Sequence, residues 1–157
     1  MNGTEIIAID RILPDLKANN QRQAFQIIAD QASRDTGLNS KRLLSRLLTW
    51  EGKSTTSSGI GGGVAIPQLT MWELRKPYAL FTRLTHMIDY NSVDSAPVDL
   101  ICLLLSPQSD GPYHLQRLAK ISRLLRDENL CQSLRSADSH DALYALLMGP
   151  GSQLMAA

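Results

Sequence analysis

The run from Val98 to Leu105 places the strongest constraint on how this chain can fold. Its side chains are almost all apolar, and it lies between Pro97 and Pro107. A run of this length that does not alternate between apolar and polar residues is typical of a strand covered on both faces. We therefore predict that this segment is the central strand of a sheet with helices on both sides.

Helical patterns occur both before and after this run. Apolar side chains recur at helical spacing over about residues 20–37 and again over about residues 40–50, as they do in amphipathic helices. Two shorter helices are expected over residues 128–134 and 141–148, the second with a serine as its N-cap. A frayed tail is expected from Gly149 onward.

The most regular helical pattern starts at His114. Its apolar side chains fall on one face, which we expect to pack on the sheet, and its basic side chains lie largely on the opposite, solvated face. The expected buried face consists of Leu115, Leu118, Ala119 and Leu125. The expected basic face consists of Arg117, Lys120, Arg123 and Arg126.

Three further segments are predicted to be strands. Residues 9–13 fit an edge strand or an entry segment, residues 64–66 form a short apolar strand before a proline, and residues 78–85 are rich in strand-forming side chains. Because strands and helices are interspersed, the predicted fold class is α/β, a mixed β-sheet flanked by helices on both faces. We expect one domain over residues 1–150 and a C-terminal tail over residues 151–157.

Charge and composition argue against several classes of function. Sixteen Lys and Arg against fifteen Asp and Glu give a formal net charge of +1, so no overall field draws the chain to nucleic acid or anionic lipid. No apolar run is long enough to span a membrane. Cys102 and Cys131 stand among apolar neighbours, as core cysteines do in a reducing compartment, and they lack metal-ligand spacing. We expect a cytoplasmic protein with no cofactor, no metal, no nucleic-acid partner and no membrane insertion.

The glycine-rich segment over residues 58–63 needs a specific explanation. Glycines at this density cost chain entropy unless the backbone must take unusual angles or approach a ligand closely. One reading is a loop that cradles phosphate, but no Gly-Lys-Ser/Thr ending follows, and the loop precedes a strand instead of joining a strand to a long helix. The other reading is a tight loop with positive backbone angles. Both stay open on these residues alone.

The sequence from Ser58 to Pro67, SGIGGGVAIP, resembles the TGIGNGIAIPH signature of type-2 enzyme IIA domains of the phosphotransferase system. The PVDL of residues 97–100 and the His-Leu pair at His114 resemble two further motifs of this nitrogen-regulatory and mannitol/fructose-type family, in the same order and spacing. The resemblance covers nearly the whole chain and implies the mannitol-type α/β sandwich. It also implies a phosphoryl site made by Ser58, Gly59, Gly61, Gly63, His114 and the position of Gln68.

Gln68 stands where the family has its phospho-accepting histidine. A neutral imidazole has a nitrogen lone pair that can attack phosphorus, whereas the nitrogen lone pair of a carboxamide is delocalised into its carbonyl group. Leu69 replaces a family glycine, and Trp50 lies nearest the position of an arginine that would clamp a phosphoryl group. Trp50, Met71 and Trp72 flank the glycine loop in sequence and suit either protein recognition or the core.

The three histidines differ in what their surroundings imply. In the family, the counterpart of His114 lies beside the phosphorylated histidine and helps to stabilise the phosphoryl group. Here a residual anion-binding role and an ordinary surface role both stay open for His114. His86 and His140 belong to no motif and are expected to be ordinary surface residues.

The resemblance implies a regulatory protein that binds partners through the surface around Gln68 but does not switch by phosphorylation. Losing the phosphoryl group removes a charge of about −1.5 to −2 from such a switch. The implied partners are an HPr-like phosphocarrier, transporter subunits or sensor kinases. The alternative is an active phosphocarrier in a phosphoenolpyruvate-dependent cascade that uses His114. A third reading is a sensor of small anions that uses the glycine loop.

Overall fold

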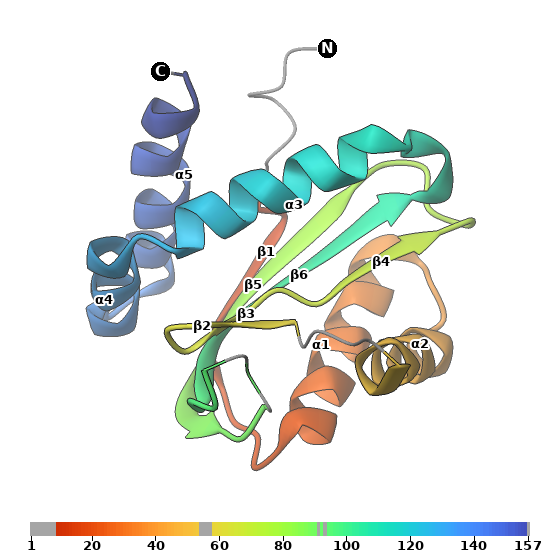
Figure 1. Cartoon of the computed structure of the whole chain (residues 1–157), viewed down its shortest axis with the longest axis horizontal. Helices are drawn as coiled ribbons and strands as arrows, with labels where there is room; N and C mark the ends of the chain where they lie inside the picture. The colour runs from red at the N-terminus through yellow and green to blue at the C-terminus, as the bar shows by residue number, and fades with distance from the viewer. Residues whose placement is uncertain (1–8, 54–57, 91, 93, 157) are drawn as a thin grey trace.

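The computed structural model describes residues 9–53, 58–90, 92 and 94–156. Over these residues a six-stranded mixed sheet lies between two layers of helices (Figure 1). The helices are α1 (Gln21–Thr36), α2 (Ser40–Lys53), α3 (Pro112–Leu125), α4 (Glu128–Ser136) and α5 (His140–Ala156). The strands are β1 (Arg11–Leu16), β2 (Gly59–Gly61), β3 (Val64–Ala65), β4 (Gln68–Met71), β5 (Tyr78–Ile88) and β6 (Val98–Pro107).

Strand β6 forms the centre of the sheet, as its apolar run predicts. It pairs antiparallel with β5 on one side and parallel with β3 and β4 on the other. Alternate side chains of β6 point to opposite layers. Leu103 and Leu105 belong to the core under α1 and α2, whereas Cys102 and Leu104 belong to the core under α3, α4 and α5. The predicted fold class and the buried central strand are therefore confirmed.

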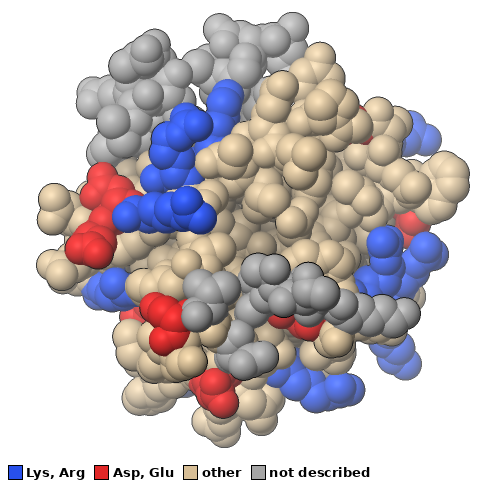
Figure 2. All heavy atoms as spheres, in the orientation of Figure 1, with Lys and Arg blue, Asp and Glu red and all other residues tan. Residues whose placement is uncertain are grey.

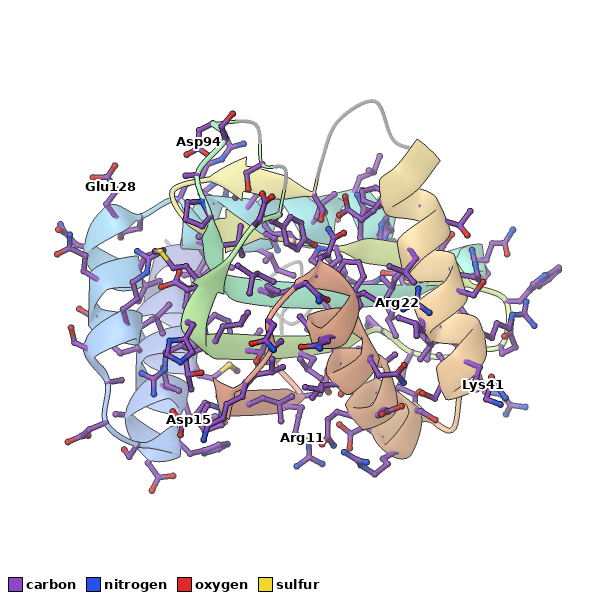
Figure 3. All side chains as sticks on the ribbon, turned by 90° about the horizontal axis from the view of Figure 1, so that it is seen from below. Arg11, Asp15, Arg22, Lys41, Asp94 and Glu128 are labelled. Carbon is purple, nitrogen blue, oxygen red and sulfur yellow. The ribbon has the colours of Figure 1, made fainter. Side chains whose placement is uncertain are left out.

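Helices α1 and α2 form the layer on one face of the sheet, seen in front in Figure 3. Asn20 caps α1 by accepting a hydrogen bond from the backbone N–H of Gln23, and Gly37 ends it with a φ of 82°. Both ends agree with the predicted bounds. Helix α2 continues to Lys53 instead of ending near Trp50. A single glycine inside a helix, here Gly52, lowers helix stability without ending the helix.

Helix α3 packs on the sheet through a different face from the one predicted. Leu115 is 65% exposed and Ala119 is exposed, while Leu118 is only half-buried. The prediction was wrong because Arg117, assigned to the solvated face, is buried in an ion pair with Asp110. The side chains that α3 buries are His114, Arg117, Ile121, Leu124 and Leu125.

Two strands differ from their predicted positions. Strand β1 covers residues 11–16 instead of 9–13, and it tolerates Pro14 because it lies at the edge of the sheet, where it pairs only with β5. Strand β4 was not predicted, because Pro67 was taken to end strand pairing. The carbonyl oxygen of Pro67 instead accepts a hydrogen bond from the backbone N–H of Leu104, so the chain returns to β6 directly after the proline.

The C-terminal helix is longer than predicted. Ser139 caps it as expected, because its hydroxyl oxygen accepts a hydrogen bond from the backbone N–H of Ala142. Helix α5 then continues past Met148, the predicted end, and reaches Ala156. Pro150 lacks one amide hydrogen and therefore removes one bond of the helical ladder, which here leaves the helical path intact. Within the described residues, no helix is both long enough and apolar enough to cross a membrane.

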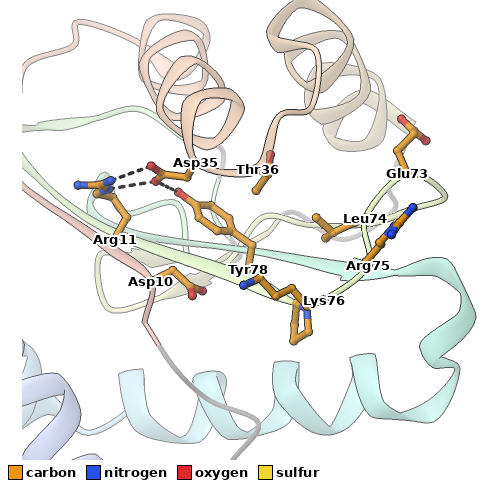
Figure 4. Close-up of a pocket in the computed structure, with 10 residues that line it drawn as sticks. Asp10, Arg11, Asp35, Thr36, Glu73, Leu74, Arg75, Lys76 and Tyr78 are labelled. Atoms are coloured by element: carbon orange, nitrogen blue, oxygen red, sulfur yellow. Dashed lines mark hydrogen bonds and ion pairs between the residues drawn. The ribbon is translucent and has the colours of Figure 1, made fainter.

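Three polar side chains tie strands β1 and β5 to α1 and line a pocket of about 500 Å³ (Figure 4). Arg11 donates from Nε to Asp35 Oδ2 at 3.0 Å and from Nη2 to Asp35 Oδ1 at 2.7 Å. The hydroxyl of Tyr78 donates to Asp35 Oδ2 at 2.6 Å. The bond from Arg11, followed by those from Tyr78 and Gln31, lowers the pKa of Asp35 from 3.8 to about 2 against the opposing effect of burial.

The variant Asp35→Asn is expected to lower the free energy of unfolding by about 1 kcal/mol at neutral pH, a modest value because solvent screens the half-exposed Arg11. The folded-state pKa of about 2 lies below the ordinary 3.8. The stabilisation is therefore complete above about pH 5 and is lost as the pH falls toward 2. Urea unfolding at several pH values measures the difference between variant and parent. Asp138→Asn, at an exposed carboxylate, is the matched control, and a difference that grew on acidification would contradict this assignment.

Candidate functional site

Strand β4 and helix α3 bring Gln68 and His114 together. Gln68 is the first residue of β4 and pairs with Leu104 of β6, while His114 lies in the first turn of α3. Nε2 of His114 and Oε1 of Gln68 are in hydrogen-bond contact. The histidine is 7% exposed and the glutamine is half-buried. The predicted contact between these two residues is thus present, but His114 is a buried residue and the surface reading of it is wrong.

A buried polar chain continues from the other side of the imidazole ring. Nδ1 of His114 lies 2.7 Å from the hydroxyl oxygen of Ser106. Nη1 of Arg117 donates to the same hydroxyl oxygen at 3.0 Å. Nη2 of Arg117 donates to Asp110 Oδ2 at 2.5 Å, which pairs the guanidinium with a carboxylate. The series Asp110, Arg117, Ser106, His114, Gln68 is therefore continuous.

Sequence reasoning missed Ser106, Asp110 and Arg117. The spacing of His114 and Arg117, three residues apart on a helix, places both side chains on one helix face and was the one available indication. Ser106 ends the apolar run of β6, and it is the pleat of this strand that points the hydroxyl toward α3. Nothing in the sequence identifies a serine at a strand end as a partner of a distant imidazole.

Burial lowers the pKa of His114 below its ordinary value, and the positive charge of Arg117 lowers it further, while Asp110 opposes the shift. The imidazole is therefore neutral at physiological pH. A neutral imidazole has one N–H and one bare nitrogen. Here both nitrogens already have hydrogen-bond partners within the protein.

Ser58 and Gly59 lie apart from this chain. The hydroxyl of Ser58 is in hydrogen-bond contact with Glu51 and lies 2.8 Å from the hydroxyl of Tyr90, in the helical layer of α1 and α2. Gly59 lies against Ser92, whose Oγ would be only 2.5 Å from a Cβ atom built at this position. Ser58 thus joins the start of β2 to helix α2, in the layer opposite α3, and Gly59 packs against the segment between β5 and β6.

Gly61 ends β2, and Gly62 and Gly63 form the turn to β3; their φ values are 99°, 66° and 81°, in that order. Gly62 donates its backbone N–H to Asp94 and offers its carbonyl oxygen to Arg135. Figure 3 shows Asp94 beside this hairpin. The turn borders a pocket of about 590 Å³ with Arg126 and Arg135. Arg135 is however paired with Asp99, so the guanidinium and the turn amide of Gly62 already have partners.

The glycine turn and the Gln68–His114 pair occupy different positions along β6. The carbonyl oxygen of Gly63 accepts from the N–H groups of Asp99 and Leu100, whereas Gln68 pairs with Leu104. At about 3.3 Å per residue this separates them by about 15 Å along the strand. The structure therefore brings together Gln68 and His114 among the predicted site residues and leaves the glycines elsewhere, in a turn with positive backbone angles.

Replacing Gly63 by alanine is expected to lower the free energy of unfolding by about 1–3 kcal/mol. The φ of this residue is +81°, and an added Cβ would lie 2.5 Å from Nη2 of Arg135. Thermal and urea unfolding measure the loss. Gly52→Ala in helix α2 is the matched control, because a Cβ there meets nothing within 4 Å, and it should keep or slightly raise stability. Equal effects of the two changes would show that the turn does not need its glycine.

The residues that flank the glycine loop have different surroundings. Trp50 is half-buried and packs against the core under α1 and α2. Met71 is fully buried, and its sulfur accepts a hydrogen bond from Arg46. Trp72 is 73% exposed. Trp72 is thus the member of this group that is available for protein recognition, and Met71 is a core residue.

His86 and His140 are exposed, as expected of ordinary surface residues. Leu69, which replaces a glycine of the resembling family, is buried in the core under α1 and α2. Its side chain therefore points to the layer opposite His114. A bulky residue at this position fills the core and does not cover the surface of the Gln68–His114 pair.

Comparison with known proteins identifies the family of this chain. Residues 5–149 match the family described as phosphoenolpyruvate-dependent sugar phosphotransferase system, EIIA 2. The chain belongs to this family. This enzyme IIA chain is also 42% identical over 147 residues to the nitrogen regulatory protein of Bradyrhizobium diazoefficiens, covering 94% of this chain and 95% of that protein.

Solved structures have the same fold. This enzyme IIA chain is similar to the crystal structure of nitrogen regulatory protein IIA-Ntr from Neisseria meningitidis, with a TM-score of 0.83 and 25% identity over 92% of this chain and 97% of that one. It shares its fold with enzyme IIAMTL of Escherichia coli, solved in complex with phosphorylated enzyme IIBMTL, with a TM-score of 0.72 and 19% identity over 91% and 97% of the two chains. The predicted relationship to the nitrogen-regulatory and mannitol types is confirmed.

Proposed function

We propose that this enzyme IIA chain is a regulatory protein that acts by contacting other proteins and accepts no phosphoryl group at position 68. The observation that carries the proposal is the hydrogen bond between Gln68 and His114. Gln68 occupies the position of the phospho-accepting histidine, and its carboxamide has no nucleophilic nitrogen. Without phosphorylation and dephosphorylation at this position, the charge of the surface around Gln68 stays constant, and regulation depends on that constant surface.

A phosphocarrier that uses His114 is the alternative, and the surroundings of the ring count against it. Nε2 contacts Gln68, Nδ1 contacts Ser106, and the side chain is 7% exposed. An attacking nitrogen must point its lone pair at the phosphorus atom in line with the leaving group. Either nitrogen would first have to lose a buried hydrogen bond and gain access to solvent.

Exposed apolar side chains flank the pair and supply a surface for protein contact. Tyr113 and Leu115, on either side of His114 in α3, are 48% and 65% exposed. Trp72, directly after β4, is exposed as well. Figure 2 shows a broad uncharged area over the N-terminal half of α3, whereas basic side chains gather over its C-terminal half. Exposed aromatic and leucine side chains around a polar centre suit docking of a protein partner.

The proposed partners are an HPr-like phosphocarrier, a transporter subunit or a sensor kinase, and the proposed compartment is the cytoplasm. The proposed site comprises Gln68, His114 and their exposed neighbours. In this proposal Ser58, Gly59, Gly61 and Gly63 shape the β2–β3 hairpin, which lies away from the Gln68–His114 pair along β6, and do not bind phosphate. The complex of the mannitol enzyme IIA with its enzyme IIB gives a precedent for a protein partner on this fold.

The test is a titration of the isotope-labelled protein with an HPr-like carrier, followed by NMR. Amide shifts are expected to change around Gln68, His114 and Leu115. Leu115→Ala should weaken binding at least about tenfold, or about 1.4 kcal/mol, while it changes unfolding by less than about 0.5 kcal/mol. Tyr144→Ala, at an exposed aromatic residue of α5, is the control and should bind as the parent does. An unchanged affinity of the Leu115 variant would contradict the proposed surface.

A further inference from the structure

We infer that Gln68 meets its partner as a hydrogen-bond donor: His114 holds its carbonyl oxygen, and its NH2 group is left for an acceptor oxygen of the bound protein. The orientation of the amide follows from the buried polar chain alone. The recognition half of the inference rests on the proposed function, because it needs a protein partner at this surface.

The direction of the hydrogen bonds is fixed at the arginine end of the chain. A guanidinium can only donate, so the hydroxyl oxygen of Ser106 accepts from Nη1 of Arg117. The hydroxyl has one proton, and the neighbouring acceptor in the chain is Nδ1 of His114, 2.7 Å away. Donation of this proton to Nδ1 leaves that nitrogen without a proton of its own.

The charge of the ring decides the next step. Burial and the nearby charge of Arg117 keep the imidazole of His114 neutral. A neutral ring with a bare Nδ1 must have its proton on Nε2. Nε2–H then donates to Gln68, which can accept only through its carbonyl oxygen. The buried chain thereby determines an amide orientation that an isolated glutamine would leave open.

The remaining group of Gln68 is its NH2, which offers two donors. Gln68 is half-buried, and its partner His114 is flanked in α3 by the exposed side chains of Tyr113 and Leu115. A donor at the centre of an apolar contact area must be satisfied when a partner covers it, since an unpaired buried donor is costly. The partner should therefore carry a carbonyl or carboxylate oxygen at this point, and a partner with an N–H or ammonium group there is disfavoured.

The orientation is tested on the free protein by NMR of its labelled histidine rings. The expected result is a single neutral tautomer of His114 with a protonated Nε2 and a bare Nδ1. Ser106→Ala should give a mixture of tautomers, and Ser106→Thr, which keeps the hydroxyl, should restore the single form. A parent ring protonated on Nδ1 would overturn the inference, as would a Ser106→Ala variant with an unchanged tautomer. A merely structural role of Ser106 would alter stability without changing the tautomer.

The recognition half is tested by binding of the HPr-like carrier to two variants. Gln68→Glu keeps the acceptor toward His114 but replaces the outward donor with an oxygen, and Gln68→Met removes both groups at similar length. Both should weaken binding at least about tenfold. A loss with Gln68→Glu alone would show that charge and not the donor matters, and would overturn this half. Unchanged binding of both variants would also overturn the recognition half of the inference, and so would a failure of the carrier to bind the parent protein.

The inference and the proposed function fail in distinguishable ways. Phosphorylation of the unmodified protein would end the proposed function, whereas the tautomer of His114 would still report the amide orientation. A Nδ1-protonated ring in a protein that takes up no phosphoryl group would end the inference alone.

Discussion

Replacing Leu103 by alanine is expected to lower the free energy of unfolding by about 2–5 kcal/mol, one of the two largest effects that this structure predicts. Leu103 is fully buried near the middle of β6, where it pairs with Leu80 of β5 and packs under α1 and α2. Truncation removes apolar contacts and leaves a cavity between rigid layers that cannot collapse into it. Urea unfolding followed by circular dichroism measures the loss.

Leu115→Ala is the matched control for this change. The same leucine-to-alanine truncation on α3 removes a side chain that is largely in solvent, so unfolding should change by less than about 0.5 kcal/mol. Similar losses of unfolding free energy in the two variants would contradict both the central position of β6 and the assignment of Leu115 to the exposed face of α3.

The second large effect is a gain of phosphoryl-accepting activity. Gln68→His is expected to convert the protein into a slow phosphoryl acceptor in the presence of a phosphoenolpyruvate-driven carrier cascade. The imidazole supplies a nucleophile, but rapid transfer also needs donors already placed around the phosphoryl oxygens. Adding Trp50→Arg should raise the rate at least about tenfold over the single change, equal to about 1.4 kcal/mol of barrier. Time-resolved intact mass measures both rates.

The structure changes what is expected of Leu69 in this series. On sequence alone, the bulk of Leu69 in place of a family glycine predicts that docking of the phosphoryl donor is impaired. Because Leu69 is buried in the core opposite His114, Leu69→Gly should not speed transfer and should instead lower stability by about 2–5 kcal/mol. Rapid transfer to the variant Gln68→His alone would show that the rest of the site is complete without the arginine.

The sequence was most informative where apolar patterns were long. The run of β6 and the helical spacing in α1 are dominated by burial, so residue type alone predicts which side chains enter the core. The predicted face of α3 was wrong for a physical reason. Arg117 is buried with Asp110 and Ser106 accepting hydrogen bonds from its two Nη atoms, and a pattern that counts arginine as solvated cannot register these partners.

The candidate site was predictable only in part. Family motifs placed Gln68 and His114 together correctly, since both positions are determined by the fold. Ser106 and Arg117 determine the protonation state and tautomer of the His114 imidazole. They lie at the end of β6 and on one face of α3, and only tertiary packing brings these two places into contact. The glycine loop left two readings open, and the positive backbone angles, together with the partners of Gly62, favour the tight turn.

The central claim is that the protein as it stands accepts no phosphoryl group and acts through a constant surface around Gln68. The most direct test is the intact mass of the unmodified protein after incubation with phosphoenolpyruvate, the first enzyme of the cascade and the HPr-like carrier. A phosphorylatable enzyme IIA in the same tube shows that the cascade is active. No added mass is expected on this protein while the control is fully labelled. Stoichiometric addition of one phosphoryl group, lost in the variant His114→Ala, would contradict it and establish the phosphocarrier alternative.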